Sequence, residues 1–122
     1  LTCSVPWLAS GRPDDGFYKA EILPGDDPHR FGGIFRVEDE RNPVRDWSFI
    51  YVPYCTGDVH LGSNTTQYRD VDSGEAFAIR HRGADNFRVV LAWARANLEQ
   101  PQRLLVTGSS AGAYGAVGHY VR

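Results

Sequence analysis

Two short apolar runs stand out in the chain, and each lies beside a proline. Trp47–Val52 is a nearly continuous run of aromatic and β-branched residues that Pro53 closes. Such a run predicts a strand that is buried on both faces, as in the centre of a parallel sheet. Arg103–Thr107, which follows Pro101, predicts a second buried strand. Between these runs, Ala76–Arg82 is typical of a short strand or an extended segment.

From Asp85 onwards, the spacing of the apolar residues changes to that of an amphipathic helix, which Asp85 can cap. The apolar stripe consists of Phe87, Val90, Leu91, Ala94 and Leu98. Val89 and Trp93 widen this stripe, so we expect the helix to pack on a sheet. A second helix, made of small residues, is predicted over Ala111–Val121.

This order of strand, helix, strand and helix predicts an α/β fold with a parallel sheet and flanking helices. Residues 1–46 are loop-rich, and Thr56–Asp72 is a polar stretch without a clear strand or helix pattern. In the loop-rich part, turn sequences occupy residues 11–16 and 24–28, and short extended candidates occupy residues 17–23 and 33–37. No internal repeat or linker divides the chain, so we expect its residues to belong to a single domain.

The composition excludes several classes of protein. With 42% hydrophobic and 23% charged residues, the chain is neither disordered nor collagen-like. Its 13 basic and 15 acidic residues give a net charge of −2, and the arginines are scattered. No positive field is therefore available to attract nucleic acid. We expect no nucleic-acid partner, and no membrane span either, because no apolar run approaches the roughly 18 residues that a span needs.

The cysteines and acidic residues do not predict a metal site. Cys3 and Cys55 are the only cysteines, and their separation does not fit a zinc-binding pattern. A structural thiol and a single disulfide both stay open. A nucleophilic Cys55 would have only His60 as a near base, so we favour a structural role for it. Asp70–Glu75 departs from the EF-hand pattern and reads as a solvated turn.

The sharpest chemical signal is Gly108-Ser109-Ser110-Ala111-Gly112, which matches the G-x-S-x-G pattern. The pattern lies between a predicted strand and a predicted helix, where a strained turn needs neighbours without bulk. Ser110 would be the nucleophile of this turn. The backbone N–H of Ala111 and the helix dipole would face a developing oxyanion. The alternative is a glycine-rich turn that binds a phosphate or only packs tightly.

Asp58 and His60 follow the end of the first predicted strand, at the edge where α/β sheets bind ligands. If this segment is extended, their spacing puts both side chains on one face. We expect them to line a pocket, with a loop-building role as the alternative. A role as base would require an unusual triad order for His60. His119 is excluded as base, because it lies about 13 Å along the predicted helix from Ser110.

Three blocks of the chain resemble the pectin acetylesterase and Notum family. They are Tyr51–Gly62, Arg82–Phe87 and Leu105–Gly112, and the resemblance extends over roughly residues 43–118. It implies an α/β-hydrolase fold, a secreted or periplasmic location, no metal or organic cofactor, and hydrolysis of carboxylic esters by a Ser, Asp and His triad. Ser110 takes the place of the nucleophile and Ala111 that of one oxyanion donor. Tyr54, from the first block, joins Asp58 and His60 as a candidate substrate-binding residue.

The chain also departs from the family pattern. Ala113 stands where the family commonly has Gly. The family's glycine-rich oxyanion loop, its acid and its His have no counterpart in the sequence. Because the chain also contains no Met, we expect residues 1–122 to be a segment of one α/β-hydrolase-like catalytic domain that is incomplete at both ends. The remainder of the same polypeptide would then supply the acid, the His and the oxyanion loop.

Two functions follow from these observations. The first is a carboxylic ester hydrolase that forms an acyl-enzyme on Ser110, with an acetylated carbohydrate or another acyl ester as its substrate. The second is a catalytically inactive relative that binds carbohydrate or lipid in the same pocket. Both predict the same turn around Ser110, so the motif alone does not separate them.

Overall fold

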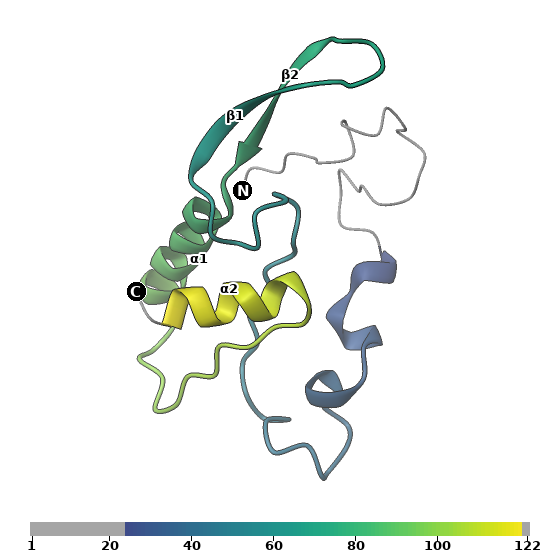
Figure 1. Ribbon diagram of the computed structural model, residues 1–122. Helices are drawn as coiled ribbons and strands as arrows, with labels where there is room; N and C mark the ends of the chain where they lie inside the picture. Colours follow the sequence, from purple (N-terminus) through teal and green to yellow (C-terminus); the bar gives the residue numbers. More distant parts are fainter. Residues whose placement is uncertain (1–23, 121–122) are drawn as a thin grey trace. The chain divides into compact units, whose positions relative to one another are not determined.

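The computed structural model describes residues 24–120 of the chain. The chain divides into two compact units, one of which is Lys19–Pro53, while the other includes Tyr54–Arg122. In the first unit the described residues form the short 3-10 helices η2 (Pro24–Asp26), η3 (Pro28–Arg30) and η4 (Gly33–Phe35). In the second they form strands β1 (Asn64–Arg69) and β2 (Ala76–His81) and helices α1 (Gly83–Asn97) and α2 (Ala111–Tyr120) (Figure 1).

In the first unit, a buried asparagine organises the described chain. The side-chain amide of Asn42 donates to the carbonyl oxygens of Ile34 and Arg36 at 2.9 and 3.0 Å, and its Oδ1 accepts from the N–H of Val44. These bonds satisfy backbone groups that no sheet satisfies. The extended segment expected over residues 33–37 is therefore wrong, since η4 occupies most of it. The extended candidate at 17–23 and the turn at 11–16 lie outside the described residues.

The two apolar runs that predicted buried parallel strands are not strands in the structure. Trp47–Val52 and Arg103–Thr107 are irregular and pair with no strand among residues 24–120. Ile50 is 45% exposed and Leu104 is 73% exposed. An apolar run becomes a buried strand only when neighbours complete its hydrogen bonds and cover both of its faces. The described residues supply neither, so the structure does not confirm the prediction of these two strands.

The sheet that is present is an antiparallel hairpin. β1 pairs with β2 in the register Asn64↔His81 to Arg69↔Ala76. In the turn, Oδ1 of Asp70 accepts from the N–H groups of Asp72 and Ser73. The strand expected near residues 76–82 is confirmed as β2. β1 was not predicted, because most of its residues are exposed and polar and give no apolar alternation.

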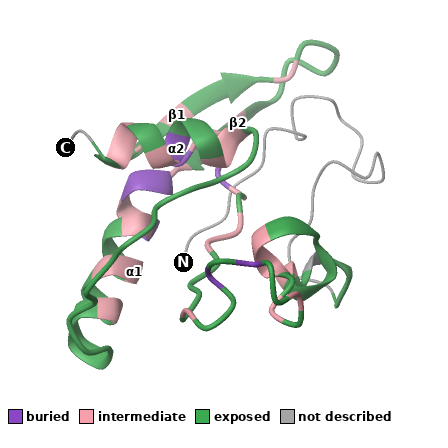
Figure 2. Ribbon diagram, turned by 90° about the horizontal axis from the view of Figure 1, so that it is seen from below, coloured by how far each residue is buried: buried purple, intermediate pink, exposed green. Residues whose placement is uncertain are grey.

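Both predicted helices are confirmed. α1 begins two residues before Asp85, which lies in its first turn and pairs with Arg82 and Arg88 instead of capping the helix. The α1 stripe is half-buried at its start, whereas Trp93 is 54% exposed (Figure 2). The expected packing of this helix on a sheet is therefore absent from the described residues. α1 and α2, the helices described, are too short to cross a membrane.

The fold class is thus α/β in its content, with two helices and a two-stranded sheet in the described chain. The parallel sheet of the prediction is not among residues 24–120, where the strands are antiparallel. The assignment of residues 1–122 to one catalytic domain stays a prediction.

Candidate active site

The turn before α2 has a strained backbone at Ser110, as expected at a nucleophile elbow. Ser110 has a φ of 52°, in the left-handed region that residues with a side chain seldom adopt. It is exposed, and it lies directly before Ala111, the first residue of α2. The N–H groups at the first turn of a helix have no partner within the helix. Ala111 therefore carries an N–H suited to a developing negative charge next to the Ser110 hydroxyl.

The two glycines of this turn differ in whether a side chain would fit at their position. A Cβ added to Gly108 would overlap the backbone of Gly112, so only glycine fits at position 108 without a shift of the main chain. A Cβ added to Gly112 would meet no heavy atom within 4 Å. The close approach of the two backbones thus explains the first glycine of the pattern, and the second is not required sterically.

A second strained segment lies at the candidate substrate-binding residues. In the Thr56–Leu61 loop, φ is 63° at Gly57, 50° at Val59 and 65° at His60. A positive φ at a β-branched residue such as Val59 is a genuine outlier. Such a conformation persists only where surrounding contacts hold it in place.

The carboxylate of Asp58 is the centre of these contacts. Its Oδ1 accepts from Thr56 Oγ1 at 2.5 Å and from the His60 N–H at 3.0 Å. Its Oδ2 accepts from the N–H of Gly83 at 2.7 Å. Gly83 is the first residue of α1, whose N-cap residue, Arg82, makes no side-chain cap. Asp58 therefore caps α1 from a distant part of the chain, and its negative charge favours the positive end of the helix dipole.

Histidines from two other elements bind the backbone of the same loop. The ring Nδ1 of His81, in β2, lies 3.0 Å from the Thr56 carbonyl, and the ring Nε2 of His119, in α2, lies 2.8 Å from the His60 carbonyl. Because a carbonyl only accepts, both ring nitrogens donate. The hydroxyl of Tyr68 lies 2.9 Å from Nε2 of His81. The loop is thus tied to the hairpin, to α1 and to α2.

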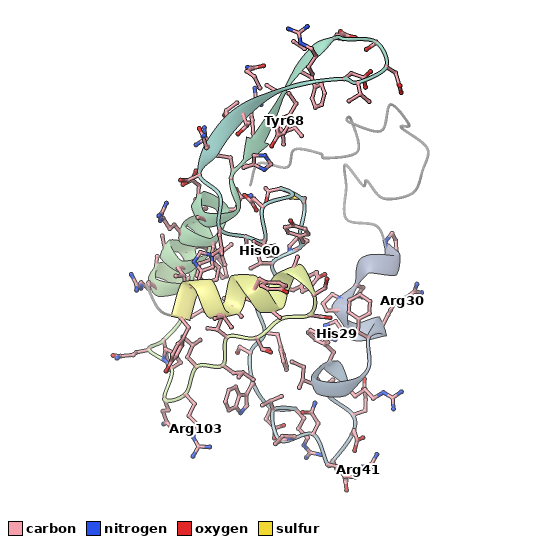
Figure 3. All side chains as sticks on the ribbon, in the orientation of Figure 1. His29, Arg30, Arg41, His60, Tyr68 and Arg103 are labelled. Atoms are coloured by element: carbon pink, nitrogen blue, oxygen red, sulfur yellow. The ribbon has the colours of Figure 1, made fainter. Side chains whose placement is uncertain are left out.

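His60 is buried and lies next to α2, close to Gly115 (Figure 3). Burial lowers the pKa of His60 from its ordinary value, with a smaller contribution from His119, and Asp58 opposes the shift. The ring is therefore neutral at pH 7. It packs against the ring of Tyr54 at a centroid distance of 4.9 Å, and the Tyr54 hydroxyl accepts from the N–H of Val59.

The structure thus gathers the predicted residues Tyr54, Asp58 and His60 in one loop. Their expected contact with substrate stays a prediction. Among residues 24–120, no hydrogen bond joins Ser110 to a histidine. Sequence reasoning missed His119, which it considered only as a base. The available signal was its position one turn after Gly115, on the same face of the predicted helix.

The structure also bears on the other candidate reactive groups, the cysteines and a metal site. Cys55 is disulfide-bonded, which agrees with the structural role favoured for it and excludes it as a nucleophile. Cys3 lies outside the described residues. Within the described part of the chain, no three His, Cys, Asp or Glu side chains form a group that could hold a metal ion.

We expect Asp58→Asn to lower the free energy of unfolding of the full-length protein by about 1–3 kcal/mol, because one buried donor then loses its acceptor. Asn retains a single acceptor oxygen, whereas three donors converge on Asp58. Urea denaturation measures the change. Asp72→Asn, at an exposed residue of the hairpin turn, is the matched control. An equal loss in the two variants would contradict a special role for the Asp58 carboxylate.

Comparisons with known proteins place the chain. Neither the search of curated proteins nor the search of solved structures found a match. The family model described as pectinacetylesterase matches residues 26–121. This match covers the Thr56–Leu61 loop, the start of α1 and the elbow at Ser110. The chain therefore belongs to the pectinacetylesterase family.

Proposed function

We propose that the protein is a serine carbohydrate esterase that removes acetyl or other acyl groups from its substrate, and that Ser110 is its nucleophile. The observation that carries this proposal is the left-handed φ of 52° at Ser110, directly before the first turn of α2. Membership of the pectinacetylesterase family supports an ester of a carbohydrate as substrate.

In the proposed reaction, Ser110 Oγ attacks the carbonyl carbon of the ester, and the hydroxyl proton passes to a general base. The N–H of Ala111 stabilises the oxyanion of the tetrahedral intermediate. The intermediate collapses to an acyl-enzyme, while the alcohol oxygen leaves with the proton. Water then attacks the acyl-enzyme, which releases the carboxylic acid and restores Ser110. The acid, the base and a further oxyanion donor come from the remainder of the same polypeptide.

We assign the Thr56–Leu61 loop, with Tyr54, to the edge of the substrate pocket. α2 begins next to Ser110, and three of its residues contact this loop: Gly115 and His119 at His60, and Gly118 at Leu61. The helix that follows the nucleophile therefore packs directly on the loop that carries the candidate substrate-binding residues. We assign contact with a sugar or an acyl group to the exposed ring of Tyr54, which packs on the buried ring of His60.

The uncovered apolar segments support an α/β-hydrolase-like sheet in the complete protein. Leu104, Leu105 and Val106 lie in the segment that leads to the elbow, and all of them are exposed. In a parallel sheet, neighbouring strands would pair with this segment and helices would cover both of its faces. In the proposed domain, this segment and Trp47–Val52 are parallel strands, and α1 covers the sheet with the face that carries Trp93.

We place the protein outside the cytoplasm, in a secreted or periplasmic compartment. The disulfide at Cys55 supports this location, because structural disulfides persist in oxidising compartments. Neither the proposed mechanism nor the residues that carry it requires a metal or an organic cofactor.

The test is covalent labelling of the full-length protein with a fluorophosphonate, which phosphonylates an activated serine. We expect a single adduct, which peptide mapping places on Ser110 and not on Ser109. An adduct on another serine would overturn the assignment of the nucleophile. A folded full-length protein that forms no adduct would favour the alternative, a relative that binds carbohydrate or lipid without hydrolysing it.

A further inference from the structure

We propose that His119 is a positioning residue for catalysis. Its hydrogen bond to the His60 carbonyl holds α2 on the Thr56–Leu61 loop, and α2 in turn holds the turn that carries Ser110. The inference rests on the proposed function of Ser110, and it assigns no direct role in proton transfer to His119.

Gly115, Gly118 and His119 contact the loop from one face of α2. A Cβ added to Gly115 would lie 2.9 Å from Cβ of His60, and one added to Gly118 would lie 2.5 Å from Cδ2 of Leu61. His119 donates to the His60 carbonyl from the same face. Residues four apart on a helix share a face, so the face that carries Gly115 and His119 continues to Ala111. The proposed oxyanion donor therefore begins the face that is fixed on the loop.

The hydrogen bond of His119 is one of three contacts that link α1, α2 and the loop to one another in a closed triangle. The His119 ring stacks on the ring of Phe87, in α1, with a centroid distance of 3.9 Å and an angle of 18°. The start of α1 is held to the loop by the bond from the Gly83 N–H to Asp58. The loop binds His119 through the carbonyl of His60. Each tie thus restrains the other two, and α2 cannot slide along the loop without breaking one of them.

This restraint acts on the nucleophile because a helix transmits displacement along its axis. Ser110 precedes the first residue of α2, and its left-handed backbone conformation is unfavourable for a residue with a side chain. Strain of this kind persists only when the surroundings over-determine it. If the distal tie at His119 is lost, α2 can shift or rotate, and the turn at Ser110 can relax. The attack geometry would then be populated less often.

The experiment compares His119→Leu with Tyr120→Leu in the full-length protein. Both changes replace a ring by the same aliphatic side chain at the end of α2, and Tyr120 is exposed. The rate of phosphonylation of Ser110 and the kcat and KM for an aryl acetate are measured for each. We expect His119→Leu to lower the phosphonylation rate and kcat roughly tenfold, less than the 10²-fold cost of a displacement of 1 Å. KM should change little, and Tyr120→Leu should keep the parent values.

A pair of polar variants separates positioning from general stability. The amide nitrogen of Gln reaches about as far from the backbone as Nε2 of His, whereas that of Asn falls short. His119→Gln should therefore restore most of the phosphonylation rate, and His119→Asn should not. The comparison of His119→Gln with His119→Asn tests the positioning role even if His119→Leu fails to fold.

The outcomes distinguish this inference from the proposed function. A parent protein that is not labelled at Ser110 would overturn the proposed function and the positioning role with it. A parent that is labelled at Ser110, with equal rates in His119→Gln and His119→Asn, would overturn the positioning role alone. A rise in KM at constant kcat in the His119 variants would also overturn it, because the effect would then lie in substrate binding.

Discussion

Ser110→Ala in the full-length protein is expected to lower kcat for an aryl acetate by about 10⁶-fold, the scale on which loss of a triad serine acts. Alanine removes the only atom that can form the acyl-enzyme, and the remaining rate comes from binding and from the oxyanion donors. Steady-state kinetics with parent and variant at matched active-site concentration measure the loss. Alanine also fits the left-handed turn no worse than serine, so circular dichroism should show an unchanged fold.

Ser109→Ala is the matched control for this prediction. Ser109 lies one residue earlier in the same turn and is exposed. It acts through its backbone, since its carbonyl accepts from the N–H of Gly112 at 2.8 Å. Alanine keeps that carbonyl, so the control should retain most of the activity. A comparable loss in the two variants would show that the turn, and not the Ser110 hydroxyl, is sensitive to substitution.

The helices were predictable from the sequence because their signals are local. The 3.6-residue spacing of Phe87, Val90 and Leu91 and the small residues after Gly112 depend on no distant partner. The buried strands were not predictable in the same way. Apolar content in Trp47–Val52 indicates what the segment would do in a complete sheet, whereas strand formation requires neighbours that the described residues do not contain.

β1 is the opposite case: its local sequence pattern is weak, but it forms a strand because it pairs with β2. Its six residues are mostly polar and exposed, but the turn after Arg69 closes tightly around the Asp70 side chain. Its partner strand β2 carries Ile79, which is 3% exposed and lies opposite Thr66. A hairpin can thus form from a polar strand when its turn is well specified and its partner contributes the apolar residue.

For the candidate site, the sequence indicated the residues better than their roles. Asp58 and His60 were expected to face a pocket from an extended segment. In the structure, the loop is bent by successive left-handed residues, and the Asp58 carboxylate binds the backbone of Gly83, 25 positions later in the chain. Such a contact has no local signature, because the acceptor and the donor become neighbours only when the chain folds. The same holds for His119, which binds a carbonyl 59 positions earlier.

The elbow itself depends on one backbone contact more than on its pattern of small residues. Gly108 approaches Gly112 so closely that a Cβ on Gly108 would overlap the carbonyl carbon and oxygen of Gly112. These atoms belong to the first turn of α2 and cannot turn aside as a flexible side chain can. The two glycines, which the sequence pattern treats alike, are therefore expected to differ when each is replaced by alanine.

Gly108→Ala in the full-length protein is expected to lower the rate of phosphonylation of Ser110 by at least about 10²-fold, because a main-chain shift on the order of 1 Å misplaces the nucleophile. The phosphonylation rate of Gly112→Ala should fall far less, because the added Cβ would enter open space and the backbone conformation at position 112 suits any residue. Both rates are measured with the same fluorophosphonate, and urea denaturation shows whether each variant is folded. If Gly112→Ala loses as much as Gly108→Ala, the close backbone approach does not determine the geometry of the elbow. If a folded Gly108→Ala reacts at the parent rate, Ser110 does not need the turn that the structure shows.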